Sequence, residues 1–416
     1  MKEDYFEKLS ALVASPNTSE DFQEAFISFK YTGNIPNPPS ITIAGHKKVE
    51  AFNELFKQIY NQLHVEKYKI SFKAFVKNAE QLFFFNSFNI KNVCNMIKEK
   101  SCTTYTNICK IYGVKLSQDV LSFYDVKFVK KDYIIDFLKS TILETTDNKI
   151  WLEKLIEQKA VEISSNANFI YFVYNYDSFD SDYSKQMAEK CLSDTINVIR
   201  YMIGIKNERI YVDNTEFNDY RQHFDQFSSS GMILPSSKLI KKDIAFDLAD
   251  PFFNATNNGN ERIWEILSKP NKNQVEKKIL KAIKWIGLSI EETQLDVACA
   301  EIAFAFESLL KADEKSVISP SIQGQIADSV AFICGETADE RIKIVNDFKT
   351  FYGYRSAIAH GAEKSTDINY QKYLNMIKNV VINLLTDDSL NKCTSLDELN
   401  SLINAKKYGC VNDNLD

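Results

Sequence analysis

The sequence predicts a mainly α protein, in which an all-α helical bundle follows a mixed, predominantly helical N-terminal region with a few strands. From about Gln274 onward, apolar residues recur every three or four positions, as they do on one face of a helix. Earlier in the chain, runs of aromatic and β-branched residues indicate buried strands. A chain of 416 residues, 44% hydrophobic and 25% charged, suffices for two or three globular domains.

The start of the chain shows mostly helical patterns. Tyr5, Leu9 and Leu12 have helical spacing, so we expect the first thirty residues to be helical. The stretch YTGNIPNPPS, which ends at Ser40, predicts a loop because it is rich in Gly, Pro and Asn. Helical patterns resume in two segments, residues 49–59 and 72–85.

Strands are predicted in the middle of the chain. SFYDVKF, between Val120 and Val129, alternates imperfectly and favours a strand. NFIYFVYNYD, residues 168–177, has the composition of a buried strand. A helix from Ser184 to Ile203 and a short strand from Arg209 to Asp213 follow.

The polar run at Asn254 to Asn260 predicts a domain boundary. We therefore expect a mixed α+β N-terminal region in residues 1–253, with a further sub-boundary near residue 160. Residues 261–386 would form the helical bundle, and residues 387–416 a C-terminal tail.

Within the bundle, Val275, Ile279, Ile283, Ile286 and Ile290 form the first apolar stripe. Four more stripes follow, with short loops between them, which is typical of a helical bundle. Three helix starts carry N-terminal signals: Thr293 with Asp296, Ser319 with Pro320, and Thr337 with Glu340.

Composition excludes several classes of protein. A net charge of −6 argues against a general nucleic-acid-coating surface, although it allows a local basic groove. The eight cysteines form no C-x-x-C pair and have no histidine at zinc-finger spacing, so we expect free thiols and no metal. No apolar run reaches the roughly 18 residues of a membrane span, and the acidic N-terminus does not resemble a secretion signal. We expect a cytoplasmic protein with no membrane partner.

Arginine and histidine are scarce, with six and four copies, yet Arg355 stands five residues before His360 in FYGYRSAIAHG. On a continuous α-helix, five residues turn about 500°, which leaves the two side chains roughly 140° apart. They could share a face if the helix ended between them, and Gly361 suits a helix end. Otherwise the two groups would act together with a partner chain.

This motif resembles that of HEPN ribonucleases, in which Arg, a polar residue and a few others precede His near the end of a bundle helix. YRSAIAHG is similar to the motif of the Apea-like branch, with Tyr354, Arg355, Ser356, His360 and Gly361 in place. KAIKWIGLSIEET and AFAFESLLKADE resemble the first two helices of that branch, including a glutamate at Glu307. The resemblance covers about 110–125 residues and implies a HEPN-type helical bundle.

The resemblance implies a metal-independent endoribonuclease that needs no cofactor. Arg355 and His360 would be catalytic, with possible support from Ser356, Glu307 and Tyr354. It also implies 2′,3′-cyclic phosphate and 5′-hydroxyl ends, a homodimer through the C-terminal bundle, and a role in anti-phage defence or a toxin-like abortive response. Residues 1–253 would then sense a trigger, such as a phage-derived protein, or restrain the nuclease.

The residue types suit this chemistry. RNA cleavage without a metal needs a base for the ribose 2′-hydroxyl proton and an acid for the leaving 5′-oxygen, and histidine can serve in either role. A fixed cation must stand beside the phosphate oxygens as negative charge accumulates there. The planar guanidinium of arginine meets that need.

Structural interpretations stand beside these functional ones. His360 could bond the last carbonyls of its helix, and Arg355 could form an ion pair with a neighbouring helix. Ser356 could bond the backbone, and Glu307 could belong to a structural ion pair. Tyr352 and Tyr354 could stack on a base or pack in the core, and we expect the other histidines, His46, His64 and His223, to lie on the surface.

A second function also stays open. The C-terminal bundle could be a catalytically inactive HEPN module for binding or dimerisation within a larger defence complex.

Overall fold

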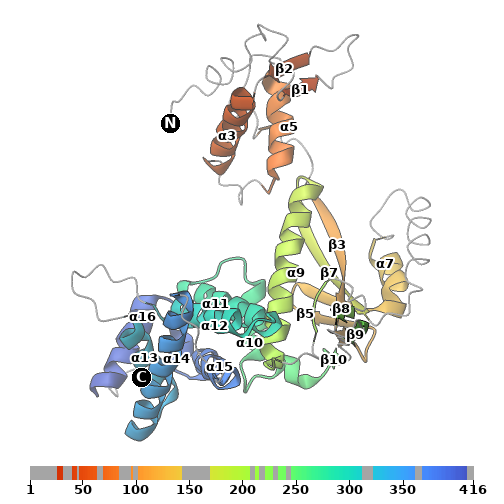
Figure 1. Cartoon of the computed structure of the whole chain (residues 1–416). Helices are drawn as coiled ribbons and strands as arrows, with labels where there is room; N and C mark the ends of the chain where they lie inside the picture. The colour runs from red at the N-terminus through yellow and green to blue at the C-terminus, as the bar shows by residue number, and fades with distance from the viewer. Residues whose placement is uncertain are drawn as a thin grey trace. The chain divides into compact units, whose positions relative to one another are not determined.

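The computed structural model describes residues 26–30, 40–44, 46–62, 69–83, 95–96, 102–142, 169–206, 211–214, 221–227, 233–239, 245–311, 322–360 and 368–409 (Figure 1). These residues are mainly α-helical with a few short strands, as the sequence predicted. The chain divides into two compact units, Met1–Asn107 with Tyr174–Lys190 and Ile108–Val173 with Cys191–Asp416. The boundary predicted at Asn254–Asn260 lies within the second unit.

The first unit begins with a hairpin where the sequence predicted helix. Strand β1 (Phe26–Lys30) pairs antiparallel with β2 (Ser40–Ala44), so the helical expectation for the first thirty residues is wrong at residues 26–30. The β-pairing with β2, some fourteen residues away, is not visible in the local spacing of apolar residues. The rest of that expected helix, and the loop predicted before Ser40, lie outside the described residues.

Two helices complete the described core of the first unit, α3 (His46–Gln62) and α5 (Phe72–Phe83). Both confirm helices that the sequence predicted. Phe52 and Phe56 of α3 are buried one turn apart, and their ring centroids are 4.5 Å from each other. Phe75 of α5 packs against Phe56 at 6.0 Å. The Ser71 hydroxyl accepts a hydrogen bond from the Ala74 backbone and caps the start of α5.

A four-stranded sheet has the order β3-β7-β6-β5, and a helix follows its last strand in sequence. The predicted strand near Val120–Val129 is a hairpin of two strands, with Tyr124 in the left-handed region at φ 52°. The predicted strand at residues 168–177 and the predicted helix that ends at Ile203 are both confirmed. The bounds are β3 (Thr103–Tyr112), β5 (Val120–Phe123), β6 (Val126–Lys130), β7 (Phe169–Ser178) and α9 (Ser181–Ile203).

The strand predicted at Arg209–Asp213 does not form in its described part. Tyr211 and Val212 are buried outside any strand, and Asp213 makes a single β-bridge to Tyr112. At Gly113, whose φ is +80°, an added Cβ would lie 1.2 Å from the Tyr211 carbonyl oxygen. Two backbones therefore meet there at a distance that requires glycine.

Several short elements connect these larger ones. Strand β4 pairs parallel with β10, and β8 pairs antiparallel with β9. Their bounds, with those of the short helices, are β4 (Val114–Lys115), β8 (Arg221–Phe227), β9 (Ile233–Leu239), β10 (Phe246–Asp247), η1 (Lys131–Tyr133), α7 (Ile134–Ile142), η3 (Pro251–Asn254) and α10 (Asn260–Ser268).

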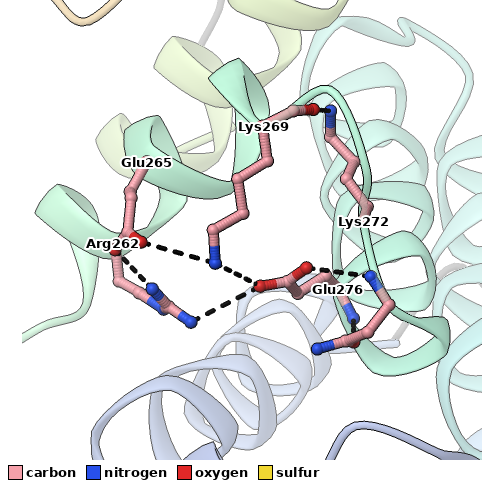
Figure 2. A network of polar contacts seen from close by, with 6 residues as sticks. Arg262, Glu265, Lys269, Lys272 and Glu276 are labelled. Carbon is pink, nitrogen blue, oxygen red and sulfur yellow. Dashed lines mark hydrogen bonds and ion pairs between the residues drawn. The ribbon is translucent and has the colours of Figure 1, made fainter.

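Helix α10 is fixed by a buried tryptophan and by an ion-pair network. The Trp264 indole N–H donates to the Phe253 carbonyl at 2.8 Å, and its ring stacks on Phe123 at 4.5 Å. Figure 2 shows the carboxylate of Glu276, at the start of the next helix, joined by ion pairs to Arg262 of α10 and to Lys269 at the C-terminal end of α10. The polar run predicted as a boundary is thus followed by a helix that is firmly packed within the second unit.

The C-terminal helices confirm the predicted apolar stripes. They are α11 (Gln274–Glu291), α12 (Leu295–Leu310), α13 (Ile322–Cys334), α14 (Ala338–Ala359) and α15 (Tyr370–Thr386). Figure 1 shows these helices gathered together in the teal-to-blue part of the chain. Buried phenylalanines pack α12 against α14. The ring centroid of Phe306 in α12 lies 5.0 Å from that of Phe348 and 6.1 Å from that of Phe351 in α14.

The predicted helix starts had different outcomes. Thr337 and Glu340 form the predicted capping box, whereas Thr293 and Asp296 do not, since the N-cap of α12 is Gln294, which makes no side-chain cap. The Glu292 carboxylate accepts the Gln294 backbone N–H in their place. Ser319 and Pro320 lie outside the described residues.

The segment predicted as a tail contains a packed helix, α16 (Leu396–Tyr408), after a 3-10 turn, η4 (Leu390–Lys392). Ser395 and Glu398 form a capping box at its start, and Leu399 and Ile403 are buried. The sequence carried this signal as Ser-x-x-Glu before an apolar pair. No helix in the described part of the chain is long and apolar enough to span a membrane.

Candidate functional site

The Arg-His motif lies on the last turns of α14. The helix continues through Ala359, and His360 is its C-terminal cap, with φ −96° and ψ 9°. The His360 backbone N–H donates to the Ser356 and Ala357 carbonyls, each at 3.2 Å. The helix therefore continues unbroken from Arg355 to Ala359, and His360 is the first residue beyond it. Ideal helical geometry up to this cap would leave the two side chains about 140° apart.

Arg355 is oriented by a carboxylate and two aromatic rings. Its Nη2 lies 3.3 Å from Oε1 of Glu307 on α12. The guanidinium carbon is 5.8 Å from the Phe304 ring centroid and 5.6 Å from that of Tyr352. The arginine side chain remains 26% exposed, so the group is held in place while part of it faces solvent.

Glu307 links Arg355 to a second residue of α14. The Tyr352 hydroxyl donates to Oε1 of Glu307 at 2.9 Å, the same oxygen that faces the guanidinium. Burial raises the pKa of Tyr352, and the bond to Glu307 raises it further, so the hydroxyl keeps its proton and remains a donor. One carboxylate oxygen thus accepts a hydrogen bond from Tyr352 and forms an ion pair with Arg355, three residues later on α14.

Tyr354 points to a different acid. Its hydroxyl donates to Oδ1 of Asp296, in the first turn of α12, at 2.7 Å. Burial and the bond to Asp296 raise the pKa of Tyr354 to about 12. Among the described residues this hydroxyl has no contact with Arg355 or Glu307, so Tyr354 anchors the two helices rather than the guanidinium.

The side chains of Ser356 and His360 are less constrained by contacts than those of Arg355 and Tyr354. Ser356 is half-buried and His360 is exposed. Within the described part of the chain neither side chain makes a hydrogen bond, so the imidazole does not bond the helix carbonyls, whereas the His360 backbone N–H does.

The remaining histidines give no second site among the residues described. His46 is exposed, 3.9 Å from Glu50 one turn away. His64 lies outside the described residues, as do the side-chain surroundings of His223 in β8. The described part of the chain also contains no group of three His, Cys, Asp or Glu residues that could hold a metal ion, and its six cysteines are free.

The structure thus brings Glu307 to Arg355, which agrees both with a supporting role for this glutamate and with a structural ion pair. It adds Phe304, which sequence reasoning did not single out and which lies beneath the guanidinium. It also shows a contact of Tyr352 that was not expected, the hydrogen bond to Glu307. The spacing of three residues between Tyr352 and Arg355 was a signal that they share a helix face.

No protein-family model, curated protein or solved structure matches this chain. The HEPN resemblance therefore remains a prediction that rests on the motif and the helix pattern alone. The function has to be argued from the site.

Proposed function

We propose that the protein is a metal-independent endoribonuclease, with Arg355 and His360 as its catalytic pair. The observation that carries this proposal is the state of Arg355. Glu307 and two rings orient it, it stays one-quarter exposed, and it lies on the helix that an exposed histidine caps. An oriented, accessible cation near a titratable group is what phosphodiester cleavage requires.

The reaction would follow from these two groups. The ribose 2′-oxygen attacks the adjacent phosphorus as an imidazole removes its proton, and the bond from phosphorus to the 5′-oxygen breaks. A proton passes to that 5′-oxygen, which leaves a 2′,3′-cyclic phosphate and a 5′-hydroxyl. Arg355 stabilises the negative charge on the non-bridging oxygens. Atoms and charge balance without a cofactor.

The angular offset on α14 supports a site that two chains build together. Ideal helical geometry up to the His360 cap would leave the two side chains about 140° apart, so that one phosphate could not easily reach both groups of one chain. A two-fold homodimer through the C-terminal bundle would place both motifs along one cleft. Residues 1–253 would sense a trigger or restrain the nuclease, in a defence or toxin-like setting.

RNA integrity tests the proposal directly. Purified full-length protein is incubated with RNA, and the ends of the products are identified. We expect wild type to produce 5′-hydroxyl ends, and His360→Ala to lose cleavage by orders of magnitude. His46→Ala is the matched control, since it removes an exposed histidine from another helix. Added chelator should leave the rate unchanged.

The inactive binding module remains the second candidate, and the Arg355–Glu307 pair is the observation that favours it. In that case Arg355 would serve packing or dimerisation alone. Wild type would then leave RNA intact under every condition, while Arg355→Ala would change the oligomeric state measured by light scattering.

A further inference from the structure

The outward face of α11 carries a row of lysines. Lys277, Lys281 and Lys284 are exposed, and their spacing of four and three residues places them within about 60° of one another around the helix. The opposite face of α11 is buried. Within the described part of the chain none of the three forms an ion pair. Although the protein has a net charge of −6, this helix face carries three positive charges that have no ion-pair partner among the described residues.

An aromatic pair continues this row. Trp285 follows the last lysine on α11, and its ring centroid lies 5.1 Å from that of Phe304 on α12, with the planes 54° apart. Phe304 is 37% exposed although it is a large apolar side chain. The two rings offer an apolar surface beside the charges, at a point where the folded chain does not cover them completely.

The aromatic pair leads to the candidate site. The Phe304 ring contacts Trp285 on one helix and the guanidinium of Arg355 on another. Helices α11 and α12 lie side by side and antiparallel here. The Lys278 Nζ, seven residues before Trp285, donates to the carbonyl of Lys311, seven residues after Phe304. The lysines, the two rings and Arg355 thus follow one another across three helices.

We propose that this surface, the lysine–aromatic track (Lys277, Lys281, Lys284, Trp285 and Phe304), binds single-stranded RNA and leads it to Arg355. The lysines would neutralise backbone phosphates, and the rings would stack on bases, which a duplex does not expose. The track deepens the proposed ribonuclease function and rests on it for its reaction. RNA binding by the track can nevertheless be measured without cleavage.

The positive charge of the track favours RNA over a second copy of the chain as its binding partner. An interface between identical copies repeats the same patch on both sides. Lysines on a two-fold axis would then approach lysines, and like charges brought together repel. A polyanion supplies a negative charge at each nucleotide.

The first experiment measures RNA affinity in a His360→Ala background, so that the RNA stays intact. Lys277, Lys281 and Lys284 are changed together to Gln in the full-length protein. Binding of a labelled single-stranded RNA is followed by fluorescence anisotropy over a range of salt concentrations. Losing three phosphate contacts at about 0.7 ions each should make the slope of log K against log salt shallower by about 2. Affinity at low salt should fall more than tenfold.

The matched control changes Lys343, Lys349 and Lys392 to Gln. These three lysines are exposed in the same unit, belong to elements other than α11 and form no ion pair among the described residues. The net charge changes by the same amount, so a loss that depends only on charge would be equal in the two variants. We expect the control to retain affinity within about threefold and to keep the steeper salt slope.

A second pair of variants tests the stacking surface. Phe304→Ala should weaken RNA binding by about 5- to 100-fold, as loss of one base–aromatic stack does. Phe304→Tyr keeps the ring and should retain affinity close to that of the parent. Circular dichroism of each variant shows whether α12 has stayed folded.

The outcomes distinguish RNA binding by the lysine–aromatic track from the proposed ribonuclease activity. If wild type leaves RNA intact but the α11 variant loses RNA affinity, the ribonuclease proposal fails and the track stands. If the α11 variant binds RNA as the control does, the track is overturned whether or not RNA is cleaved. A change in oligomeric state in place of RNA affinity would identify an interface between copies instead. Competition by polyglutamate as effective as that by RNA would reduce the face to a general anion surface, which also overturns the proposal.

Discussion

Two arginine–glutamate clusters in the C-terminal unit use the same residue types in different ways. In the α10–α11 cluster (Figure 2), the Glu276 side chain is 7% exposed and accepts from Lys269 at 2.7 Å, while Arg262 lies at 3.4 Å. In the α12–α14 cluster, Arg355 meets one carboxylate at 3.3 Å and remains 26% exposed. The first cluster surrounds a buried acid with donors, whereas the acid of the second, Glu307, is 23% exposed and pairs with a single arginine.

This difference separates a structural ion pair from a candidate ligand site. Burial alone would raise the pKa of Glu276, but the bonds from Lys269 and the Asn273 backbone outweigh it and leave the pKa below its ordinary value. The carboxylate is therefore stabilised by contacts that only the folded chain provides. Arg355 has spare donor capacity, because a guanidinium carries five N–H groups and Glu307 is its one carboxylate partner among the described residues.

The largest contrast should appear in catalysis. Arg355→Ala removes the cation that we propose faces the phosphate, and we expect the rate of the proposed RNA cleavage to fall by about 10²–10³-fold or more. Arg262→Ala removes an arginine of similar exposure from the other cluster and should leave the rate within about twofold. Initial rates of the purified full-length variants decide the matter. Equal losses in both variants would mean that Arg355 acts only through stability.

The order should reverse when stability is measured. Glu276→Gln removes the buried negative charge that faces Lys269 and Arg262, and the free energy of unfolding should fall by about 1–3 kcal/mol. Glu307→Gln breaks a more exposed pair and should cost less than about 1 kcal/mol. Urea unfolding followed by tryptophan fluorescence measures both. A Glu307→Gln loss as large as that of Glu276→Gln would place Arg355 in a structural network.

A smaller effect should separate the two tyrosines of the motif. Tyr352→Phe removes the hydroxyl that shares the Glu307 oxygen with Arg355, and cleavage should fall about 3- to 10-fold with little change in melting temperature. Tyr354→Phe removes a hydroxyl bound to Asp296 and should cost less activity. If Tyr354→Phe is the more damaging of the two, Asp296 rather than Glu307 supports the site.

The smallest effect concerns Glu301 on α12, which has no arginine partner among the described residues. Burial and repulsion from Glu292 raise its pKa from 4.5 to about 7, although Lys206 opposes the shift. The folded state therefore holds this proton more tightly than the unfolded state does, so stability falls as the pH rises from about 4.5 to 7. Glu301→Gln should raise the melting temperature at pH 8 by about 1–2 °C relative to wild type. At pH 4 the two proteins should melt together, and a gap that persists at pH 4 would exclude this titration as the cause.

The sequence predicted most reliably where one periodic pattern decides the structure. The stripe from Val275 to Ile290 forms α11, because an apolar face at helical spacing has one way to be buried. Strands depend on partners far along the chain. Phe26–Lys30 needs β2 to become a strand, and Asp213 found only a single bridge to Tyr112, which local patterns cannot reveal.

For the candidate site, the spacing in YRSAIAHG located Arg355 and His360 on one helix, and the resemblance suggested Glu307. Sequence could not show that Phe304 lies beneath Arg355, since that contact depends on how α12 packs against α14. The capping box expected at Thr293 and Asp296 failed for a similar reason. Asp296 is used by Tyr354, which comes 58 residues later.

The Arg355–Glu307 contact has a consequence for how a ligand would arrive. A guanidinium that already rests on a carboxylate is not a vacant charge, so a phosphate must exchange places with Glu307 or share the guanidinium with it. A single mononucleotide gains little from that exchange, because one anion replaces another. A long strand that is anchored elsewhere on the protein brings its phosphate to the guanidinium at high local concentration, and this phosphate can displace Glu307. The Arg355–Glu307 ion pair would therefore make the site bind long RNA strands in preference to mononucleotides.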